Sequence, residues 1–550
     1  MPQLLPDIEL RRHRGRKKRL YNSVLFLFFS HFLPLLIFLS PLSAHGIQEK
    51  PTPPVRFSLS RLGGPLLDPH RVQGDLELHL NPNLFEGLLK TDAATGELIP
   101  ALATAWQWIN PQTIEFSLRK NVFFHNGEPF DAEAVRFSFE RMAAVTEGFN
   151  WIKAIIPEYR RVEILNPHRV RIHFKKHNSI FLISSRFFVM LPPGLLRAQG
   201  DEAFMHHPVG TGPFAVDSIE YDNHGNVSLI RMIKNPRYWD ARLPKIDRLD
   251  FHFGLNQQES LKQLLAGKLD AIADLPIRQI LSAKKAGFDV RKKGQGLISW
   301  IYFNLTGYKR DTPIWSNKVR RAVLHAIDYE KILKIVYRDR ARVNHQWAFP
   351  GLPGSVEELG NYDYNPELAR KLLTESGYGK PFSLNMYCDD VSLDEAKIVK
   401  SSLARIGITV NIDRVDEATN NGILESRRKP DSPYNHLLKK YDFMIGDFGW
   451  GMPHNYVSHL HTFSLESFVS LVDEDYPDAQ NTKIMFADAL HSYGEDAANR
   501  KWQEITAYEL DRLSIAGLVV KDTYYAVRPD LIWMVYGAYD FSQAAYRLEK

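Results

Sequence analysis

The sequence is poor in the residues and motifs that metal clusters and catalytic centres require. Its 550 residues include one cysteine, Cys388, which excludes an internal disulfide and a cysteine-based zinc or iron–sulfur site. It contains no G-x-S-x-G, H-E-x-x-H or Walker-type motif. The adjacent acids Asp389 and Asp390 follow a predicted strand, where a solvated loop pair is the ordinary outcome. We therefore expect a protein that is not an enzyme and that holds no cofactor.

The sequence also lacks a long basic stripe outside its first residues. The formal net charge is +5, but residues 1–44 hold seven Lys or Arg and two Asp or Glu, which leaves 5 − 5 = 0 for the remainder. A near-neutral protein has no overall field that steers nucleic acid toward it. We exclude nucleic acid as the main partner.

One apolar run approaches the length of a membrane span, from Val24 to Leu42. Basic residues precede it and the small residues Ser43 and Ala44 follow it, which is the order of a secretory signal peptide. We predict that residues 1–44 are this signal, cleaved near Ala44, and that the mature protein is periplasmic. An uncleaved anchor is the alternative, and cleavage is favoured by the residues that interrupt the run: His31, Pro34 and Pro41. No cysteine near Ala44 could carry a lipid anchor.

Strand and helix patterns alternate through the rest of the chain and predict a mixed α/β or α+β fold. The strand-like runs are 113–124 and 169–176. Capping residues and apolar stripes predict helices over 131–145, which begins at Asp131, over 317–337, and over 365–377, which begins at Asn365. Residues 395–413 predict a helix that passes through Gly407 into a strand.

Several motifs occur in one consistent order along some 300 residues: NLFEGLLKTDAATGELIPALATAW (83–106), FSLRKNVFFHNGEPFDAEAVRFSFER (116–141), PVGTGPF (208–214), NPRYWDARLPKIDRLDFHF (235–253), LLAGKLDAI (264–272), IYFNL (301–305), NKVRRAVLHAID (317–328) and YDYNPELARKLLTESGY (362–378). Together they resemble the family 5 extracellular solute-binding proteins, the dipeptide- and oligopeptide-binding components of ABC importers. Most of these motifs serve the scaffold rather than the ligand site.

The resemblance implies a two-lobed periplasmic binding protein fold with a ligand cleft between the lobes and a subdomain inserted in the first lobe. The expected segments are lobe I at 45–78, 210–300 and 506–550, the inserted subdomain at 79–209, and lobe II at 301–505. Hinge closure would trap the ligand. The implied partners are a small-molecule or peptide ligand and the permease subunits of the importer in the inner membrane. We expect a monomer.

The resemblance also implies that a strand of the second lobe lines the cleft and pairs with an extended peptide. The equivalent here is YDFMIGDFGWGMPHNYVSHL (441–460), in which Gly446, Phe448, Trp450 and Met452 would share one strand face. The candidate ligand-binding residues are Phe448, Trp450, Gly451, Met452, His454, Tyr302 and Asn304.

The sequence departs from the family pattern just after this Gly-Trp pair. Peptide-binding relatives commonly place an aspartate there to pair with the ligand's α-amine, whereas this chain continues Gly451, Met452, Pro453, His454. Asp447 precedes the tryptophan, but strand alternation directs it to the other face. Either another acid pairs with the amine, or the ligand has no free α-amine at that position.

Histidines raise an alternative ligand class. His454, His459 and His461 lie close together, and His206 and His207 are adjacent. A metal complex such as a nickel chelate or haem is therefore an alternative ligand, although three histidines with no cysteine or clustered carboxylates are an incomplete ligand set. A receptor that senses its ligand without transporting it is a further alternative.

Overall fold

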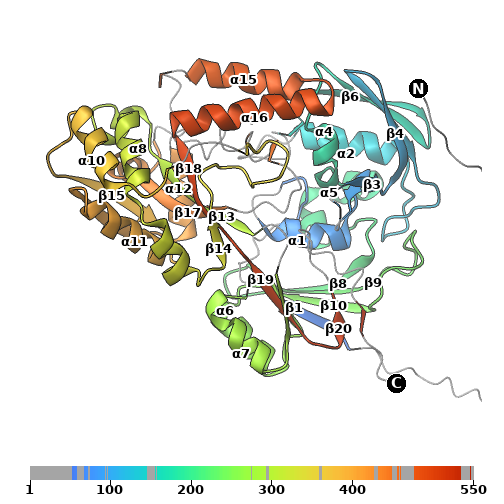
Figure 1. Cartoon of the computed structure of the whole chain (residues 1–550). Coiled ribbons are helices and arrows are strands. Elements are labelled where there is room, and N and C mark those ends of the chain that lie inside the picture. The colour runs from blue at the N-terminus through green and yellow to red at the C-terminus, as the bar shows by residue number, and fades with distance from the viewer. Residues whose placement is uncertain are drawn as a thin grey trace, which may run out of the picture. The chain divides into compact units, whose positions relative to one another are not determined.

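The computed structural model describes residues 53–58, 67–71, 75–92, 95, 97–144, 155–156, 158–273, 275–292, 296–357, 362–426, 431–448, 455–456, 459, 476–477, 479–533 and 545–546. Three sheets of four or more strands organise this part of the chain. Figure 1 shows how their strands and the surrounding helices are arranged. The two larger sheets draw strands from distant parts of the sequence, so neither is a product of local sequence alone.

The first sheet has seven strands, in the spatial order β12 (Asp289–Lys292), β19 (Tyr524–Val527), β11 (Ala271–Ile272), β1 (Val55–Ser58), β10 (Arg248–His252), β9 (Val227–Lys234) and β8 (Phe214–Tyr221). Strand β1 is parallel to both of its neighbours, and the other pairs are antiparallel. One hydrophobic cluster of this sheet includes α6 (Gln257–Leu265) and α7 (Ile280–Lys285). A separate cluster includes α1 (Asp75–Leu84) and α5 (Pro193–His206).

The second sheet has six strands, in the order β14 (Ala341–Val343), β18 (Ile515–Lys521), β13 (Leu297–Phe303), β17 (Phe443–Phe448), β15 (Phe382–Cys388) and β16 (Ile408–Arg414). Strand β15 is parallel to β16 and β17, while β13 is antiparallel to β17 and β18. One face packs on α8 (Asn317–Ala326), α10 (Pro366–Glu375) and α11 (Leu393–Ala404).

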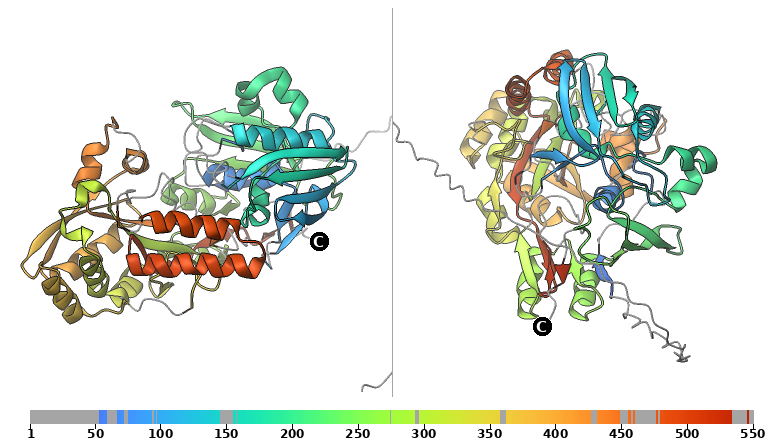
Figure 2. Two further views of the ribbon diagram at one scale, coloured as in Figure 1. Left: turned by 90° about the horizontal axis from the view of Figure 1, so that it is seen from above. Right: turned by 90° about the vertical axis from the view of Figure 1, so that its right-hand side faces the viewer.

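The third sheet has four antiparallel strands, β4 (Ala103–Asn110), β5 (Thr113–Leu118), β7 (Arg169–Phe174) and β6 (Tyr159–Asn166). Its apolar face packs against α2 (Ala132–Ala144) and α4 (Phe181–Ser184). Two helices near the C-terminus, α15 (Ala479–His491) and α16 (Glu495–Arg512), lie side by side (Figure 2). The smaller elements are β2 (Leu89–Thr91), β3 (Leu98–Pro100), β20 (Leu531–Ile532), β21 (Ala545–Tyr546), α9 (Tyr329–Lys331), α12 (Glu417–Ser426) and α13 (Asn435–Lys440).

Among the described strands, the chain passes between the two larger sheets at two places. It leaves the seven-stranded sheet after Lys292, and it returns between Lys521 and Tyr524. Lys292 Nζ lies 2.5 Å from Asp522 Oδ1, which joins the two crossings by an ion pair. Gly296 has φ +77, and a Cβ there would lie 2.3 Å from the Lys521 carbonyl oxygen. Only glycine fits this crossing without strain.

The crossings differ from the lobe boundaries expected at 300/301 and 505/506. Strand β13 already begins at Leu297, and β18 lies in the six-stranded sheet, although residues 506–550 were expected in the first lobe. The cause is the pairing of β18 with β13 from residue 515 to residue 521. The return to the seven-stranded sheet therefore comes after Lys521.

Local capping signals predicted the starts of α2 and α10. The Asp131 carboxylate accepts from the backbone N–H of Glu133 at 2.9 Å at the start of α2, and Asn365 accepts from Leu368 N at 2.9 Å at the start of α10. The helix expected over 317–337 is interrupted: α8 ends at Ala326, α9 follows, and residues 332–336 form a π-helical turn. The break arises because Asp328 acts as a new N-cap and accepts from Lys331 N at 3.1 Å.

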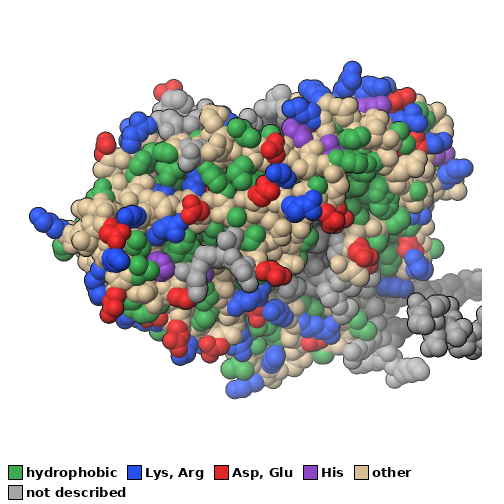
Figure 3. Space-filling model, turned by 45° about the horizontal axis from the view of Figure 1, so that its top comes forward, with side chains coloured by type: hydrophobic (Ala, Val, Ile, Leu, Met, Phe, Trp, Pro, Cys, Tyr) green, Lys and Arg blue, Asp and Glu red, His purple; other side chains and the backbone are tan. Residues whose placement is uncertain are grey.

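Basic and histidine side chains gather over the four-stranded sheet in the space-filling view, but acids lie among them (Figure 3). Glu115 is ion-paired with Arg169 and with Arg171, and Glu163 Oε2 lies 2.7 Å from His173 Nε2.

None of the helices in the described part of the chain combines the length and the apolar composition that crossing a bilayer requires.

Candidate functional site

Strands β13 and β17 lie side by side in the middle of the six-stranded sheet. Because side chains alternate along a strand, their even-numbered and odd-numbered residues occupy opposite faces. The odd-numbered residues pack in the core beneath α8, α10 and α11: Ile301, Phe303, Phe443 and Ile445. The even-numbered residues belong to a different cluster: Ile298, Trp300, Tyr302 and Met444. This even face also carries Gly446, which the sequence placed on the ligand-lining face.

Trp300, Tyr302, Trp347 and Met444 form a surface that we call the aromatic wall. The Trp300 ring centroid lies 5.7 Å from that of Tyr302 and 5.6 Å from that of Trp347, and both ring pairs are edge-to-face. Edge-to-face packing is a favoured arrangement of aromatic rings. The Tyr387 hydroxyl donates to Met444 Sδ at 2.7 Å. These contacts hold the wall as a fixed surface rather than a set of mobile side chains.

Two glycines flank Trp300 in the sheet. Gly446 opposes it on β17 and Gly517 opposes it on β18. A Cβ on Gly446 would lie 3.2 Å from Trp300 Cζ2, and a Cβ on Gly517 would lie 2.4 Å from the Asn344 carbonyl oxygen. Glycine at 446 therefore lets the indole lie against the backbone of β17.

Trp300 was not among the residues that the sequence predicted for the site, although a signal for it was available. It has the same strand parity as Tyr302, which was predicted, and stands two residues earlier in β13. Tyr302 is 2% exposed and Trp300 is 9% exposed. No residue within the described ranges accepts a hydrogen bond from Trp300 Nε1. Trp347 lies outside the regular elements, where no periodic pattern singles it out.

The opposite face of the same strands carries a buried polar cluster. Asp447 is ion-paired with Lys521, as the strand alternation predicted when it directed Asp447 away from the ligand face. Ser299 donates to the Glu395 carboxylate, and the Tyr337 hydroxyl donates to it at 3.1 Å. Burial, together with the nearby charge of Asp447, raises the pKa of Glu395 to about 7. Glu395 is thus a carboxyl that takes up a proton near neutral pH.

Asn304 uses its whole amide within the protein. Its Nδ2 donates to the carbonyl oxygens of Leu438 and Tyr441, both at 2.8 Å, and its Oδ1 accepts from the Thr306 hydroxyl at 2.7 Å. Its backbone N–H donates to the Asp442 carbonyl oxygen at 2.9 Å. These contacts tie the end of β13 to the start of β17, which is a scaffold role.

The remaining predicted site residues fall mostly outside the described residues. Phe448 ends β17, and its backbone pairs with Ile298. The others lie outside the described part: Trp450, Gly451, Met452 and His454. The assignment of these residues to a ligand site stays a prediction, and the structure shows that Trp300 lies beside β17 in the sheet, with Trp347 against its ring.

The histidines that suggested a metal complex are used in other ways where the structure describes them. His459 Nε2 lies 2.8 Å from Thr506 Oγ1, and burial lowers the pKa of His459 to about 4. His454 and His461 lie outside the described residues. Across the described segments, no group of three or more His, Cys, Asp or Glu side chains could hold a metal ion.

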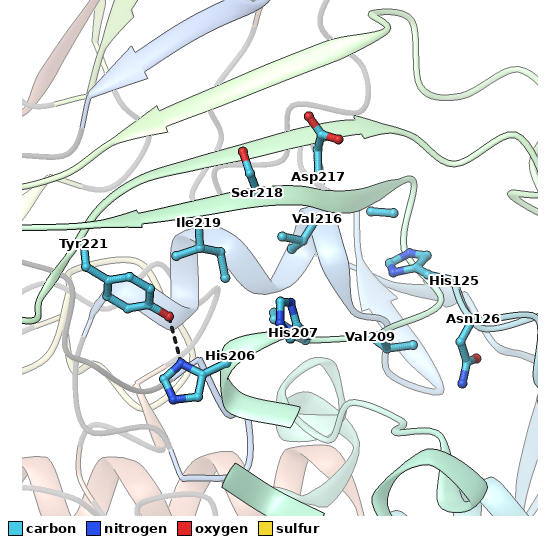
Figure 4. A pocket seen from close by; sticks show the side chains of 12 residues that line it. His125, Asn126, His206, His207, Val209, Val216, Asp217, Ser218, Ile219 and Tyr221 are labelled. Carbon is cyan, nitrogen blue, oxygen red and sulfur yellow. Dashed lines mark hydrogen bonds between the residues drawn. The ribbon is translucent and has the colours of Figure 1, made fainter. Parts of the chain in front are cut away.

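His206 and His207 line a pocket of about 520 Å³ beside β8, together with His125 (Figure 4). His206 Nδ1 lies 3.0 Å from the Tyr221 hydroxyl oxygen. His125 Nε2 lies 3.0 Å from the Gly212 carbonyl oxygen, and its Nδ1 accepts from a backbone N–H. Burial lowers the pKa of His125 to about 4, so this ring stays neutral at pH 7. With both of its ring nitrogens engaged, His125 offers no atom to a metal.

Comparison with known proteins places the chain in a family. The family model described as "Bacterial extracellular solute-binding proteins, family 5 Middle" matches residues 97–463. Among curated relatives, the chain is 26% identical over 412 residues to the heme-binding protein A of Haemophilus influenzae, covering 68% of this chain and 71% of the relative. It is 28% identical over 420 residues to the di/tripeptide-binding protein 2 of Pseudomonas aeruginosa, covering 70% and 74%.

A solved structure shows the same fold. The dipeptide-binding protein of Pseudoalteromonas sp. SM9913, determined with Met-Leu, superposes with a TM-score of 0.75 and 20% sequence identity, covering 90% of this chain and 100% of that one. The mixed α/β fold expected from the sequence is thereby confirmed as that of periplasmic binding proteins. The chain belongs to the family 5 bacterial extracellular solute-binding proteins.

Proposed function

We propose that this chain captures a peptide-like solute at the aromatic wall, closes over it, and delivers it to the permease of an ABC importer. The observation that carries the proposal is the even face of β13 and β17, where a fixed aromatic surface lies beside the backbone of the strand that ends at Phe448. Such a surface gives apolar contact without demanding one ligand side chain, and peptide pairing with a strand adds affinity that is independent of sequence. Broad specificity follows.

Closure requires a hinge, and the two crossings between the larger sheets supply one. Only two strand connections join the sheets among the described residues, at 292–297 and 521–524. The ion pair between Lys292 and Asp522 holds these connections together. Because so few connections join the sheets, one sheet can rotate against the other with small changes in the backbone dihedrals of these connections.

The location is part of the proposal. Members of this family are extracellular or periplasmic, and residues 1–44 serve here as a signal peptide that is cleaved near Ala44. Export would leave a near-neutral, monomeric periplasmic protein. N-terminal sequencing of the protein recovered from the periplasm tests this, and recovery of uncleaved chain from the membrane fraction would contradict it.

Ligand identity is tested by thermal unfolding of the exported protein with three probes: trialanine, a nickel–histidine complex and haemin. At a ligand concentration of 100 times Kd, binding stabilises the folded state by about 2.7 kcal/mol. We expect trialanine to raise the Tm. A rise with haemin or the nickel complex alone would instead support the metal-complex alternative, which a relative named heme-binding protein A also favours. No rise with any of the three would contradict the proposed ligand class.

A further inference from the structure

The indole of Trp300 in the aromatic wall carries a buried N–H without a partner among the described residues. The Trp300 indole is nine-tenths buried, and its Nε1 donates no hydrogen bond to any residue in the described part of the chain. An unpaired buried donor costs roughly 1–3 kcal/mol, and native proteins rarely keep one without a functional reason. A buried donor on the proposed ligand face therefore points to a partner that is not part of the chain.

Two other tryptophans show what distinguishes Trp300. Trp239 Nε1 donates to the buried carboxylate of Glu86 at 2.9 Å, so its indole N–H is satisfied within the fold. Trp502 Nε1 is also unpaired, but this ring is fully buried in the core and stacks on Tyr456 with centroids 5.5 Å apart. Trp300 instead is 9% exposed, and it belongs to the even face of β13, which β17 continues. Its position on the even face of β13, together with its buried N–H, distinguishes Trp300 from the other two tryptophans.

The direction of the indole is fixed by its neighbours. Trp300 Cζ2 and Cε2 lie 3.2 Å and 3.6 Å from the Cβ position of Gly446. The six-membered ring of the indole therefore lies against the backbone of β17 at Gly446, two residues before Phe448. The edge-to-face contacts with Tyr302 and Trp347 hold the ring in this orientation. The donor is preorganised before a ligand arrives.

The chemistry of this donor determines what it can recognise. An indole N–H donates and never accepts. The carboxylates of Asp447 and Glu395 belong to the other face of these strands, where Asp447 is paired with Lys521 and Glu395 accepts from Ser299 and Tyr337. We infer that Trp300 Nε1 donates a hydrogen bond to an acceptor oxygen of the bound solute, an amide carbonyl or a carboxylate. Trp300 is then a specificity-determining residue that selects the acceptor end of the solute at this wall and not its ammonium.

This inference rests on the proposed function, and it accounts for the missing aspartate after Trp450. A site that holds the ligand at this wall by an acceptor oxygen has no need of an acid there for the α-amine. The inference extends the proposal from peptide-like solutes in general to the orientation in which the wall binds them.

The test uses the exported full-length protein, calorimetric titration with dialanine, trialanine and tetraalanine, and the variant Trp300→Phe. Phenylalanine keeps an aromatic ring and removes the N–H. For the tightest of the three probes, we expect affinity to fall about 2- to 10-fold if the acceptor is a carbonyl, and about 10- to 100-fold if it is a carboxylate. Trp106→Phe, in the four-stranded sheet, is the matched control and should bind like the wild type.

The C-terminal amide of the same probe separates the two acceptors. If Trp300 binds the carboxylate, wild-type protein prefers the acid and Trp300→Phe loses that preference. If it binds a carbonyl, the variant loses affinity for acid and amide equally. Either result supports the inference.

A spectroscopic measurement reports on the N–H itself and requires no binding by the variant. The chain has 10 tryptophans, and the indole N–H resonance of Trp300 is the one missing from the spectrum of Trp300→Phe. We expect the probe to move this resonance downfield and to slow its exchange with solvent. If the variant fails to fold, sequential assignment of the wild-type spectrum identifies the Trp300 resonance, and a Trp300 resonance that does not move on binding would overturn the inference.

The outcomes separate the inference from the proposed function. If wild-type protein binds a probe while Trp300→Phe binds it equally well and no indole resonance moves, the inference is wrong and the proposed function stands. If wild-type protein binds none of the three peptides or their amides, the proposed function fails and the inference fails with it.

Discussion

Replacing Glu395 with glutamine should make the protein more stable at neutral and alkaline pH and leave it nearly unchanged in acid. Glu395 is 1% exposed. Burial first, and then the charge of Asp447, raises its pKa from 4.5 to about 7. Glutamine has the shape of the protonated acid, and its Oε1 can still accept from Ser299 and Tyr337.

The sign follows from proton binding in the two states. Between about pH 4.5 and pH 7 the folded protein holds a proton on Glu395 that the unfolded chain has released. This group's contribution to stability is therefore fully present below pH 4.5, declines as the pH rises, and is lost above about pH 7. A shift from 4.5 to about 7 corresponds to about 3 kcal/mol.

The assay is urea unfolding of wild-type protein and Glu395→Gln at several values between pH 5 and pH 8. We expect the free energies of unfolding to agree within about 1 kcal/mol at pH 5 and to differ by up to about 3 kcal/mol at pH 8. Glu504→Gln, on the exposed side of α16, is the control and should show no such trend. A difference between wild type and Glu395→Gln that is constant across this range would refute the reasoning.

Three further changes test the site, the hinge and an interface. Trp450→Ala should weaken peptide binding and leave the Tm of the ligand-free protein nearly unchanged; equal affinity by calorimetry would contradict the cleft assignment. Gly296→Ala and Gly287→Ala should each cost about 1–2 kcal/mol of stability in urea, because both positions have positive φ. Gly296→Ala should cost more than that, because only Gly296 abuts Lys521; equal losses would count against a tight crossing. Ser179→Ala should cost about 1 kcal/mol, since its hydroxyl donates to the last turn of α15; thermal unfolding checks this.

The helix ends could be predicted because their signals are local. Asp131 and Asn365 cap helices where the sequence placed caps, since a capping side chain needs only the backbone of the next turn. The break at Asp328 was missed for a related reason. The apolar stripe continues past Asp328. A prediction from helical periodicity follows that stripe, and it does not detect that one aspartate within it caps a new helix.

The candidate site could be predicted in part. Strand alternation placed Gly446 and Asp447 on opposite faces of β17, and the structure bears this out. Trp300 and Glu395 were missed because their surroundings are formed by residues that lie far away in the sequence. The indole needs Gly446 and Trp347 around it, and the buried carboxyl needs neighbours that no window of local sequence contains.

The two faces of β17 connect the aromatic wall to the crossings between the two larger sheets. Its even face bears the wall, while on its odd face Asp447 is paired with Lys521, the last residue of β18 before the chain crosses to the other sheet. The Lys521 carbonyl also closes against Gly296 of the other crossing, and Asp522 pairs with Lys292. Both crossings thus meet at a point that β17 contacts directly. Separating a buried ion pair is costly. We therefore expect a ligand that displaces β17 to displace Lys521 with it, and so to move both crossings.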